Sequence, residues 1–206
     1  MTSQAWLLPA LPLAAGLLGL LVPFGARRLA AGLAILPVTV STVLAAVLFG
    51  QVEPHASRVT ETSALLAPFG DIKVTLGTRV DGTSATIALM VCVVALAVQV
   101  YSTAYLSGDE RYPRYAAQVS LFTAAMLGVV LAADLVVLLV GWEVMGICSY
   151  LLIGHYRDLP EAPAAAVKAF LVTRVGDIGF WLGVILLGAS AHSFRISAGS
   201  VTPACA

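Results

Sequence analysis

The stretch LLVGWEVMGICSYLLIGH, residues 138–155, contains one acidic side chain, Glu143, within a run that is otherwise almost entirely apolar. A helix needs about 20 such residues to cross a hydrocarbon core of roughly 30 Å. Glu143 follows Asp134 by nine residues, which places it about 13–14 Å into such a helix. A glutamate near the middle of a membrane is either a structural partner for another residue or the working group of the protein.

The composition of the whole chain is that of an integral membrane protein. Of its 206 residues, 60% are hydrophobic and 11% are charged, whereas soluble domains have roughly 25% charged residues. Eleven basic and eleven acidic residues give no net charge, which argues against a nucleic-acid partner. No phosphate-binding glycine loop, nucleophile elbow or Cys/His ligand spacing is present, so we expect no catalytic site, cofactor site or metal site in this chain.

Six apolar stretches have the length of a transmembrane helix. They cover approximately residues 5–24, 30–49, 84–106, 114–132, 134–154 and 163–189. The alternating pattern of a membrane barrel is missing, and only helices then satisfy their own backbone hydrogen bonds in lipid. The sequence therefore predicts an all-α integral membrane protein with about six transmembrane helices.

The same pattern divides the chain into four segments. These are an N-terminal transmembrane helix pair (1–49), an extracytoplasmic loop (50–83), a transmembrane core (84–190) and an irregular tail (191–206). Within the loop, DIKVTLGTRV (71–80) alternates apolar and polar residues, which predicts a short strand or hairpin.

Basic residues in the short loops indicate the orientation. Arg27 and Arg28, Arg111 and Arg114, and Arg157 all fall on one side of the predicted helices. Because cytoplasmic loops are enriched in Lys and Arg, this side is expected to face the cytoplasm. Both termini are then extracytoplasmic, in a multi-pass protein of the cell inner membrane.

Four ionisable residues lie within the last two predicted helices: Glu143, Lys168, Arg174 and Asp177. Charges inside a membrane are costly, and they commonly mark proton or ion pathways. Arg174 and Asp177 are three residues apart and share a helix face, as a static ion pair or as part of a relay. Lys168 points about 180° away from Asp177, so it either reaches to the membrane surface or takes part in proton uptake.

Other polar residues are candidates for supporting roles. Tyr150 lies two turns after Glu143 and presents a hydroxyl to the same face, and Gly146 permits close approach of a neighbouring helix. Asp134 suits the N-cap of its helix. His155 ends the helix as an interfacial residue or a proton donor, and Trp142 is expected to be an interface anchor.

Several of these segments resemble a known family. They are VDGTSA (80–85), YSTAYL (101–106), residues 120–156 around GWE and GICSYLLIGH, and AAAVKAFLVTRVGDIG (164–179). They resemble the L subunit of bacterial NADH–quinone oxidoreductase (respiratory complex I), which is the antiporter-like counterpart of mitochondrial subunit 5.

The resemblance implies proton translocation coupled to quinone reduction, in association with other membrane subunits of the complex. NADH, FMN, iron–sulfur clusters and quinone are then bound by other subunits and not by this chain. The family's proton-translocating residues correspond to Glu143, Lys168, Arg174 and Asp177, and the glutamate pairs with a lysine on a later broken helix.

Members of this family are much longer than 206 residues, so we expect a truncated antiporter-like fold. In that fold Glu143 has no obvious cationic partner in the remaining chain. Two alternatives stay open at this point: a subunit of a cation/proton antiporter-type complex, and a non-functional truncated membrane fragment.

Overall fold

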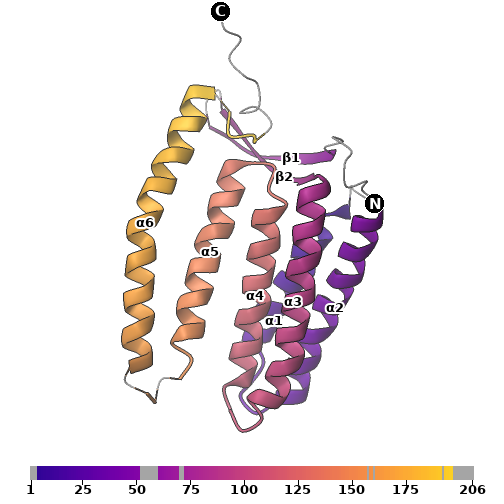
Figure 1. Cartoon of the computed structure of the whole chain (residues 1–206), viewed down its shortest axis with the longest axis vertical. Helices are drawn as coiled ribbons and strands as arrows, with labels where there is room; N and C mark the ends of the chain where they lie inside the picture. The colour runs from indigo at the N-terminus through magenta and orange to yellow at the C-terminus, as the bar shows by residue number, and fades with distance from the viewer. Residues whose placement is uncertain are drawn as a thin grey trace, which may run out of the picture.

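The computed structural model describes residues 4–51, 60–69, 72–156, 158–159, 161–191 and 193–196. In this part of the chain, six helices run side by side and a two-stranded hairpin lies across one end of them (Figure 1). The elements are α1 (Leu7–Leu20), α2 (Arg27–Gln51), β1 (Thr60–Phe69), β2 (Ile72–Val80), α3 (Gly82–Tyr105), α4 (Tyr112–Val130), α5 (Leu135–Ile153) and α6 (Glu161–Ala191). The predicted helical membrane fold is confirmed, while Asp71, Arg157 and most of the 191–206 tail lie outside the described residues.

Four of the helices, α2, α3, α5 and α6, have both the length and the hydropathy of a membrane-spanning segment. The chain is therefore a multi-pass membrane protein, although two of the six predicted spans do not meet both criteria. Helix α1 has only 14 residues. Helix α4 is packed against α1, α2, α3 and α5, so its polar residues face other helices rather than lipid.

A buried polar contact illustrates the position of α4. The side-chain amide of Gln99 on α3 donates hydrogen bonds to the Ser120 hydroxyl at 3.0 Å and to the Ala116 carbonyl at 3.1 Å. Gln99 and Ser120 are both fully buried. Because an unpaired polar group in this environment is costly, the contact fixes α3 against α4.

Small residues allow α1 and α4 to approach closely. A methyl group at Gly16 would lie 2.6 Å from Leu121 Cγ, and one at Gly19 would lie 3.0 Å from Ala117 Cβ. A larger residue at Gly16 would displace Leu121, and one at Gly19 would press on Ala117, as in many membrane helix pairs where small residues form the contact. These two contacts hold α1 tightly on one face of α4.

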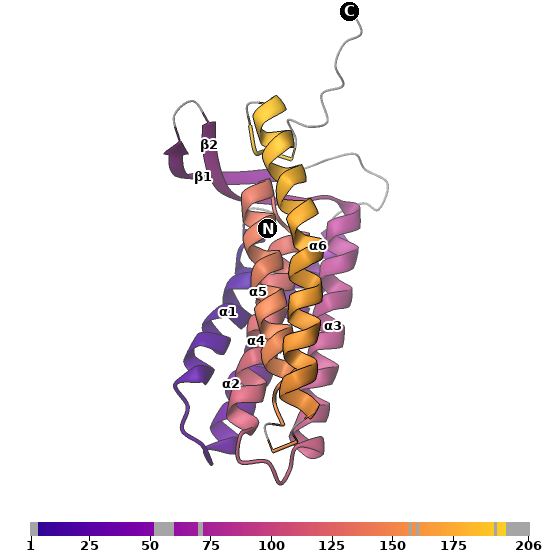
Figure 2. The ribbon, with the colours of Figure 1, turned by 90° about the vertical axis from the view of Figure 1, so that its left-hand side faces the viewer.

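Helix α6 lies at the opposite edge of the bundle, where it packs mainly against α5 and lies in front of it in Figure 2. Much of its apolar surface is exposed, including Leu171, Val172, Val175, Ile178, Leu182, Ile185, Leu186 and Leu187. An apolar surface of this extent is suited to lipid or to another membrane segment.

The hairpin covers the link between α4 and α5. Strands β1 and β2 pair antiparallel, with an irregularity between Leu65 and Ala67. The backbone N–H of Arg79 donates to the Leu131 carbonyl at 2.9 Å, and the N–H of Ala133 donates to the Gly77 carbonyl at 3.2 Å. The predicted hairpin is confirmed, and it is attached to the helix bundle by main-chain hydrogen bonds.

The loops at the other end of the bundle, which we call the basic end, are joined by side-chain contacts. Arg27 donates to the carbonyls of Thr103 and Leu106. Arg111 pairs with Asp158 at 3.2 Å, and His155 Nε2 lies 2.7 Å from Asp109 Oδ2. The loops between α1 and α2, α3 and α4, and α5 and α6 therefore lie on one side, as the sequence predicts.

The contact between Asp109 and His155 makes the stability of the basic end depend on pH. Burial by itself raises the pKa of the Asp109 carboxyl. The hydrogen bonds from the His155 ring and from the Arg111 backbone N–H, together with the positive charges of these two side chains, outweigh burial. They hold this pKa below its ordinary value of 3.8. A carboxyl with a lowered folded-state pKa stabilises the protein above its unfolded pKa, and this contribution is lost as the pH falls through the folded-state pKa.

We therefore expect Asp109→Asn to lower the free energy of unfolding by about 1 kcal/mol near neutral pH, a value reduced for solvent screening. The difference from the unmodified chain should shrink below about pH 4. Thermal unfolding in detergent micelles at several pH values measures it. Asp158→Asn is the matched control, because that side chain is 85% exposed and its ion pair contributes little. A destabilisation that persists unchanged at low pH would contradict this account.

Candidate functional site

The intramembrane charges lie on α5 and α6, two neighbouring helices that run in opposite directions (Figure 1). Asp134 caps α5 by accepting a hydrogen bond from the Val136 N–H at 2.9 Å, as predicted, and this fixes the start of the helix. Glu143 is then near the middle of α5, and Arg174 and Asp177 are near the middle of α6. The two helices therefore place all three charges at a similar depth.

Arg174 forms ion pairs with two carboxylates. Its Nη1 atom contacts Glu143 Oε2 on the facing helix and lies 3.4 Å from Asp177 Oδ2 on its own helix. The expectation that Glu143 has no cationic partner in this chain is wrong. The long arginine side chain crosses from α6 to α5, and the three-residue spacing keeps Asp177 beside it.

Two tryptophans complete the cluster in a reciprocal arrangement. Trp142 on α5 donates its indole N–H to Asp177 on α6 at 2.8 Å, and Trp181 on α6 donates to Glu143 on α5 at 3.0 Å. Each carboxylate thus accepts one indole hydrogen bond from the opposite helix. We call Trp142, Glu143, Arg174, Asp177 and Trp181 the ion cluster.

The role of Trp142 differs from the predicted one, and Trp181 was not predicted at all. The sequence predicted that Trp142 is among the aromatic residues that include interface anchors, whereas the structure gives its indole N–H a partner on the facing helix, Asp177. A signal for Trp181 was present in the sequence. It follows Asp177 by four residues and Arg174 by seven, so the three side chains share one face of α6.

Gly146 makes room for the arginine. A methyl group at this position would lie 2.6 Å from Arg174 Nη2. The sequence predicted that Gly146 would admit a neighbouring helix, and the structure shows that it admits the guanidinium group of that helix. A larger residue at this position would displace Arg174 from Glu143.

The ion cluster has an excess of negative charge. Two carboxylates share a single guanidinium, so with both acids ionised the three groups sum to one negative charge. The side chains of Glu143, Arg174 and Asp177 are only 22%, 24% and 13% exposed, and a cavity of about 630 Å³ adjoins them, lined otherwise mainly by apolar residues. Because an unbalanced charge is costly in such surroundings, the cluster is suited to binding one proton or one monovalent cation.

The other predicted residues lie away from the cluster. Lys168 is exposed near the beginning of α6 and forms no ion pair with any residue that the structure describes. Tyr150 packs against Phe170 with ring centroids 5.3 Å apart, and His155 is at the basic end. Asp134 is fully buried at the hairpin end. Glu143, Arg174 and Asp177 are thus brought together, whereas Lys168, Tyr150, His155 and Asp134 are not.

Within the described residues, no group of three or more His, Cys, Asp or Glu side chains is arranged to hold a metal ion.

Two family models match consecutive parts of the chain. Residues 66–116 match the N-terminus of chain 5 of NADH-ubiquinone oxidoreductase (complex I). Residues 132–199, which contain the whole ion cluster, match the transmembrane domain of the NADH:quinone oxidoreductase/Mrp antiporter family.

Individual proteins agree with these matches. The chain is 40% identical to NAD(P)H-quinone oxidoreductase subunit 5 of the organellar chromatophore of Paulinella chromatophora, over 92% of this chain and 29% of the relative. It is 44% identical to F(420)H(2) dehydrogenase subunit L of Methanosarcina mazei, over 58% of this chain and 18% of the relative. It therefore spans less than a third of the length of these relatives.

Among solved structures, the Mrp complex from Dietzia sp. contains a chain with the same fold. The TM-score is 0.80 with 26% sequence identity, over 97% of this chain and 21% of that chain. Sequence and fold thus agree, and the chain belongs to the family of antiporter-like membrane subunits shared by NADH–quinone oxidoreductases and Mrp antiporters, in which it matches the N-terminal part of subunit 5.

Proposed function

We propose that this chain is part of a proton-translocating, antiporter-like subunit of NADH–quinone oxidoreductase, and that the ion cluster is its proton-binding site. The observation that carries the proposal is the sharing of Arg174 by Glu143 and Asp177. With one guanidinium and two carboxylates, the cluster becomes electrically neutral when it binds one proton. Intramembrane acids with such partners are typical of proton relays.

Arg174 provides a means of coupling proton binding to movement of charge. When Glu143 is protonated, its attraction for the guanidinium is lost, while Asp177 remains ionised and keeps Arg174 on its own helix. When Glu143 releases the proton, Arg174 is drawn back across to α5. The indole N–H groups of Trp142 and Trp181 hold the two carboxylates in place during this exchange.

The remaining predicted residues have roles outside the cluster in this proposal. The basic end faces the cytoplasm, following the bias of Arg and Lys toward cytoplasmic loops, and the protein lies in the cell inner membrane. Lys168 and His155 act in proton uptake at the basic end, Tyr150 lies between that end and the cluster, and Asp134 lies at the extracytoplasmic side.

Other membrane subunits of the complex are the proposed partners, and quinone reduction drives the proton steps. We propose that NADH, FMN, iron–sulfur clusters and quinone are bound by those other subunits. The names of two relatives, an NAD(P)H-quinone oxidoreductase subunit and an F(420)H(2) dehydrogenase subunit, support a membrane subunit that serves complexes with different electron donors.

A subunit of a cation/proton antiporter is the second candidate. It is favoured by the fold similarity to a chain of the Mrp complex, and the charge of the cluster suits a monovalent cation as well as a proton. The two candidates differ in what drives transport. A respiratory subunit requires electron transfer to quinone, whereas an antiporter requires a sodium or proton gradient.

The proton-binding role of Glu143 can be tested in the assembled complex. Glu143→Gln keeps the shape of the side chain but cannot bind a proton, so we expect proton pumping per electron to fall about tenfold or more while assembly is retained. Proton uptake into vesicles, driven by quinone reduction and divided by the electron-transfer rate, measures this ratio. Glu110→Gln is the control, because Glu110 is exposed in a loop at the basic end. Unchanged pumping in Glu143→Gln would assign Glu143 a structural role.

The role of the indole donors can be tested at Trp181. Trp181→Phe keeps the aromatic ring but removes the hydrogen bond to Glu143, whose loss costs about 1–3 kcal/mol. We expect pumping per electron to fall about fivefold or more, with little change in assembly. Trp6→Phe is the matched control, since Trp6 is 55% exposed near the start of α1. Equal effects of the two substitutions would mean that Trp181 does not position Glu143.

A further inference from the structure

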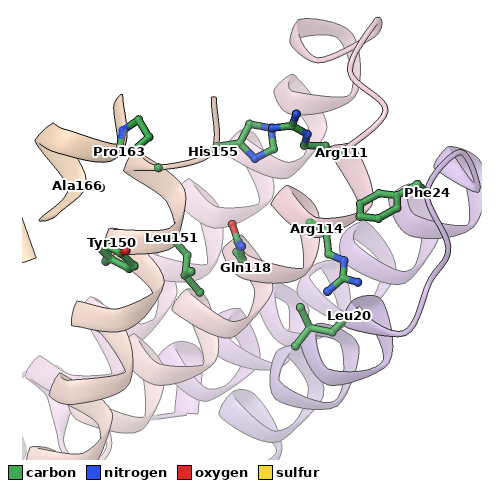
Figure 3. Close-up of a pocket in the computed structure, with 11 residues that line it drawn as sticks. Leu20, Phe24, Arg111, Arg114, Gln118, Tyr150, Leu151, His155, Pro163 and Ala166 are labelled. Carbon is green, nitrogen blue, oxygen red and sulfur yellow. The ribbon is translucent and has the colours of Figure 1, made fainter. Parts of the chain in front are cut away.

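A second cavity lies at the basic end, separate from the ion cluster. Its volume is about 800 Å³, within the range of small-molecule sites. Residues from the end of α1, from α4 and its preceding loop, from α5 and from the beginning of α6 surround it (Figure 3). It shares only His155 and Tyr150 with the residues placed on the proton path above.

The larger cavity has basic groups but no acid in its lining. Its lining includes Arg111, Arg114 and His155 but no Asp or Glu among the described residues. Arg111 and His155 also line a neighbouring cavity, together with Asp109, Glu110 and Asp158. The positive charge that belongs to the larger cavity alone is therefore that of Arg114.

Arg114 is the cation that is free to bind an anion. Arg111 is paired with Asp158, and His155 with Asp109, whereas Arg114 has no carboxylate partner in the part of the chain that the structure describes. Its guanidinium lies over the Phe24 ring, 5.2 Å from the centroid, and Figure 3 shows it beside the cavity. One uncompensated guanidinium matches the single negative charge of a phosphodiester.

A second polar group faces the same space. Gln118 lines the cavity one turn further along α4 than Arg114, and its side-chain oxygen is buried with no hydrogen-bond partner among the described residues. Such an atom is costly unless a ligand or water satisfies it. At 1.5 Å per residue, Gln118 lies about 6 Å deeper than Arg114.

The rest of the lining is apolar. Leu20, Phe24 and Leu151 lie beside the polar groups, and Phe24 is 59% exposed. A free inorganic anion would gain nothing from these side chains. A ligand with a phosphate attached to hydrocarbon would bury its apolar part against them, and the basic end of a membrane bundle is at the depth of lipid headgroups.

We propose that this cavity binds an anionic phospholipid. The phosphate contacts Arg114, the glycerol region lies deeper beside Gln118, and the upper acyl carbons lie over Leu20, Phe24 and Leu151. The lipid would fill the space between the end of α1 and α5, both of which pack against α4. This inference does not depend on the proposed proton translocation.

The test is lipid binding to the purified full chain after delipidation. Native mass spectrometry would follow titration with phosphatidylglycerol, and separately with phosphatidylcholine. We expect Arg114→Gln to weaken phosphatidylglycerol binding about fivefold or more, the loss associated with one basic residue near a lipid headgroup. Arg28→Gln is the matched control, because Arg28 is exposed at the same end and does not line the cavity.

Arg114→Lys keeps the charge and should retain most of the binding, and circular dichroism verifies that each variant is folded. The proposal is overturned if Arg114→Gln and Arg28→Gln weaken binding equally, or if phosphatidylcholine binds as tightly as phosphatidylglycerol. Displacement of the lipid by millimolar inorganic phosphate would identify a free-anion site and would also overturn it.

Discussion

Arg174 holds together α5 and α6, the two helices that carry charged residues near their middles. Its guanidinium contacts Glu143 on α5 and Asp177 on α6, and each of these carboxylates accepts an indole hydrogen bond from the other helix. Helix α6 packs mainly against α5, so these polar contacts connect an outer helix whose other contacts are apolar. Removing one partner of such a buried ion pair costs several kcal/mol, which makes the ion cluster a structural connection as well as a candidate proton site.

The rest of the bundle is held in a different manner. Helices α1 and α4 approach closely at Gly16 and Gly19, and α3 is fixed to α4 by the neutral amide of Gln99. These contacts are not changed by protonation, whereas the α5–α6 contact consists of groups whose charge can change. In the proposed function, α1 to α4 would be the constant part of the molecule, against which α5 and α6 respond to a proton.

The membrane fold could be predicted from the sequence because hydropathy and capping act locally. The apolar runs, the cap at Asp134 and the hairpin are each determined by residues close together in the chain. The Arg174–Glu143 contact was not predictable in this way. Glu143 marks one face of α5, and Arg174 and Asp177 mark one face of α6, but nothing in the sequence indicates that these two faces meet, and 31 residues separate Glu143 from Arg174. The contact of Trp142 was missed for the same reason, since its position near a helix centre becomes informative only when Asp177 is known to face it.

One aromatic ring connects the ion cluster to the basic end. The Arg174 guanidinium lies over Phe170, 4.5 Å from the ring centroid, and the same ring packs against Tyr150 at 5.3 Å. Tyr150 in turn lines the cavity that contains Arg114 and His155. A chain of contacts transmits a change only where a member has two arrangements. In the proposed function Arg174 is that member, because its Nη1 atom contacts two carboxylates and protonation of Glu143 would leave it with Asp177. Phe170 is then the contact through which a change at Tyr150 would reach the ion cluster.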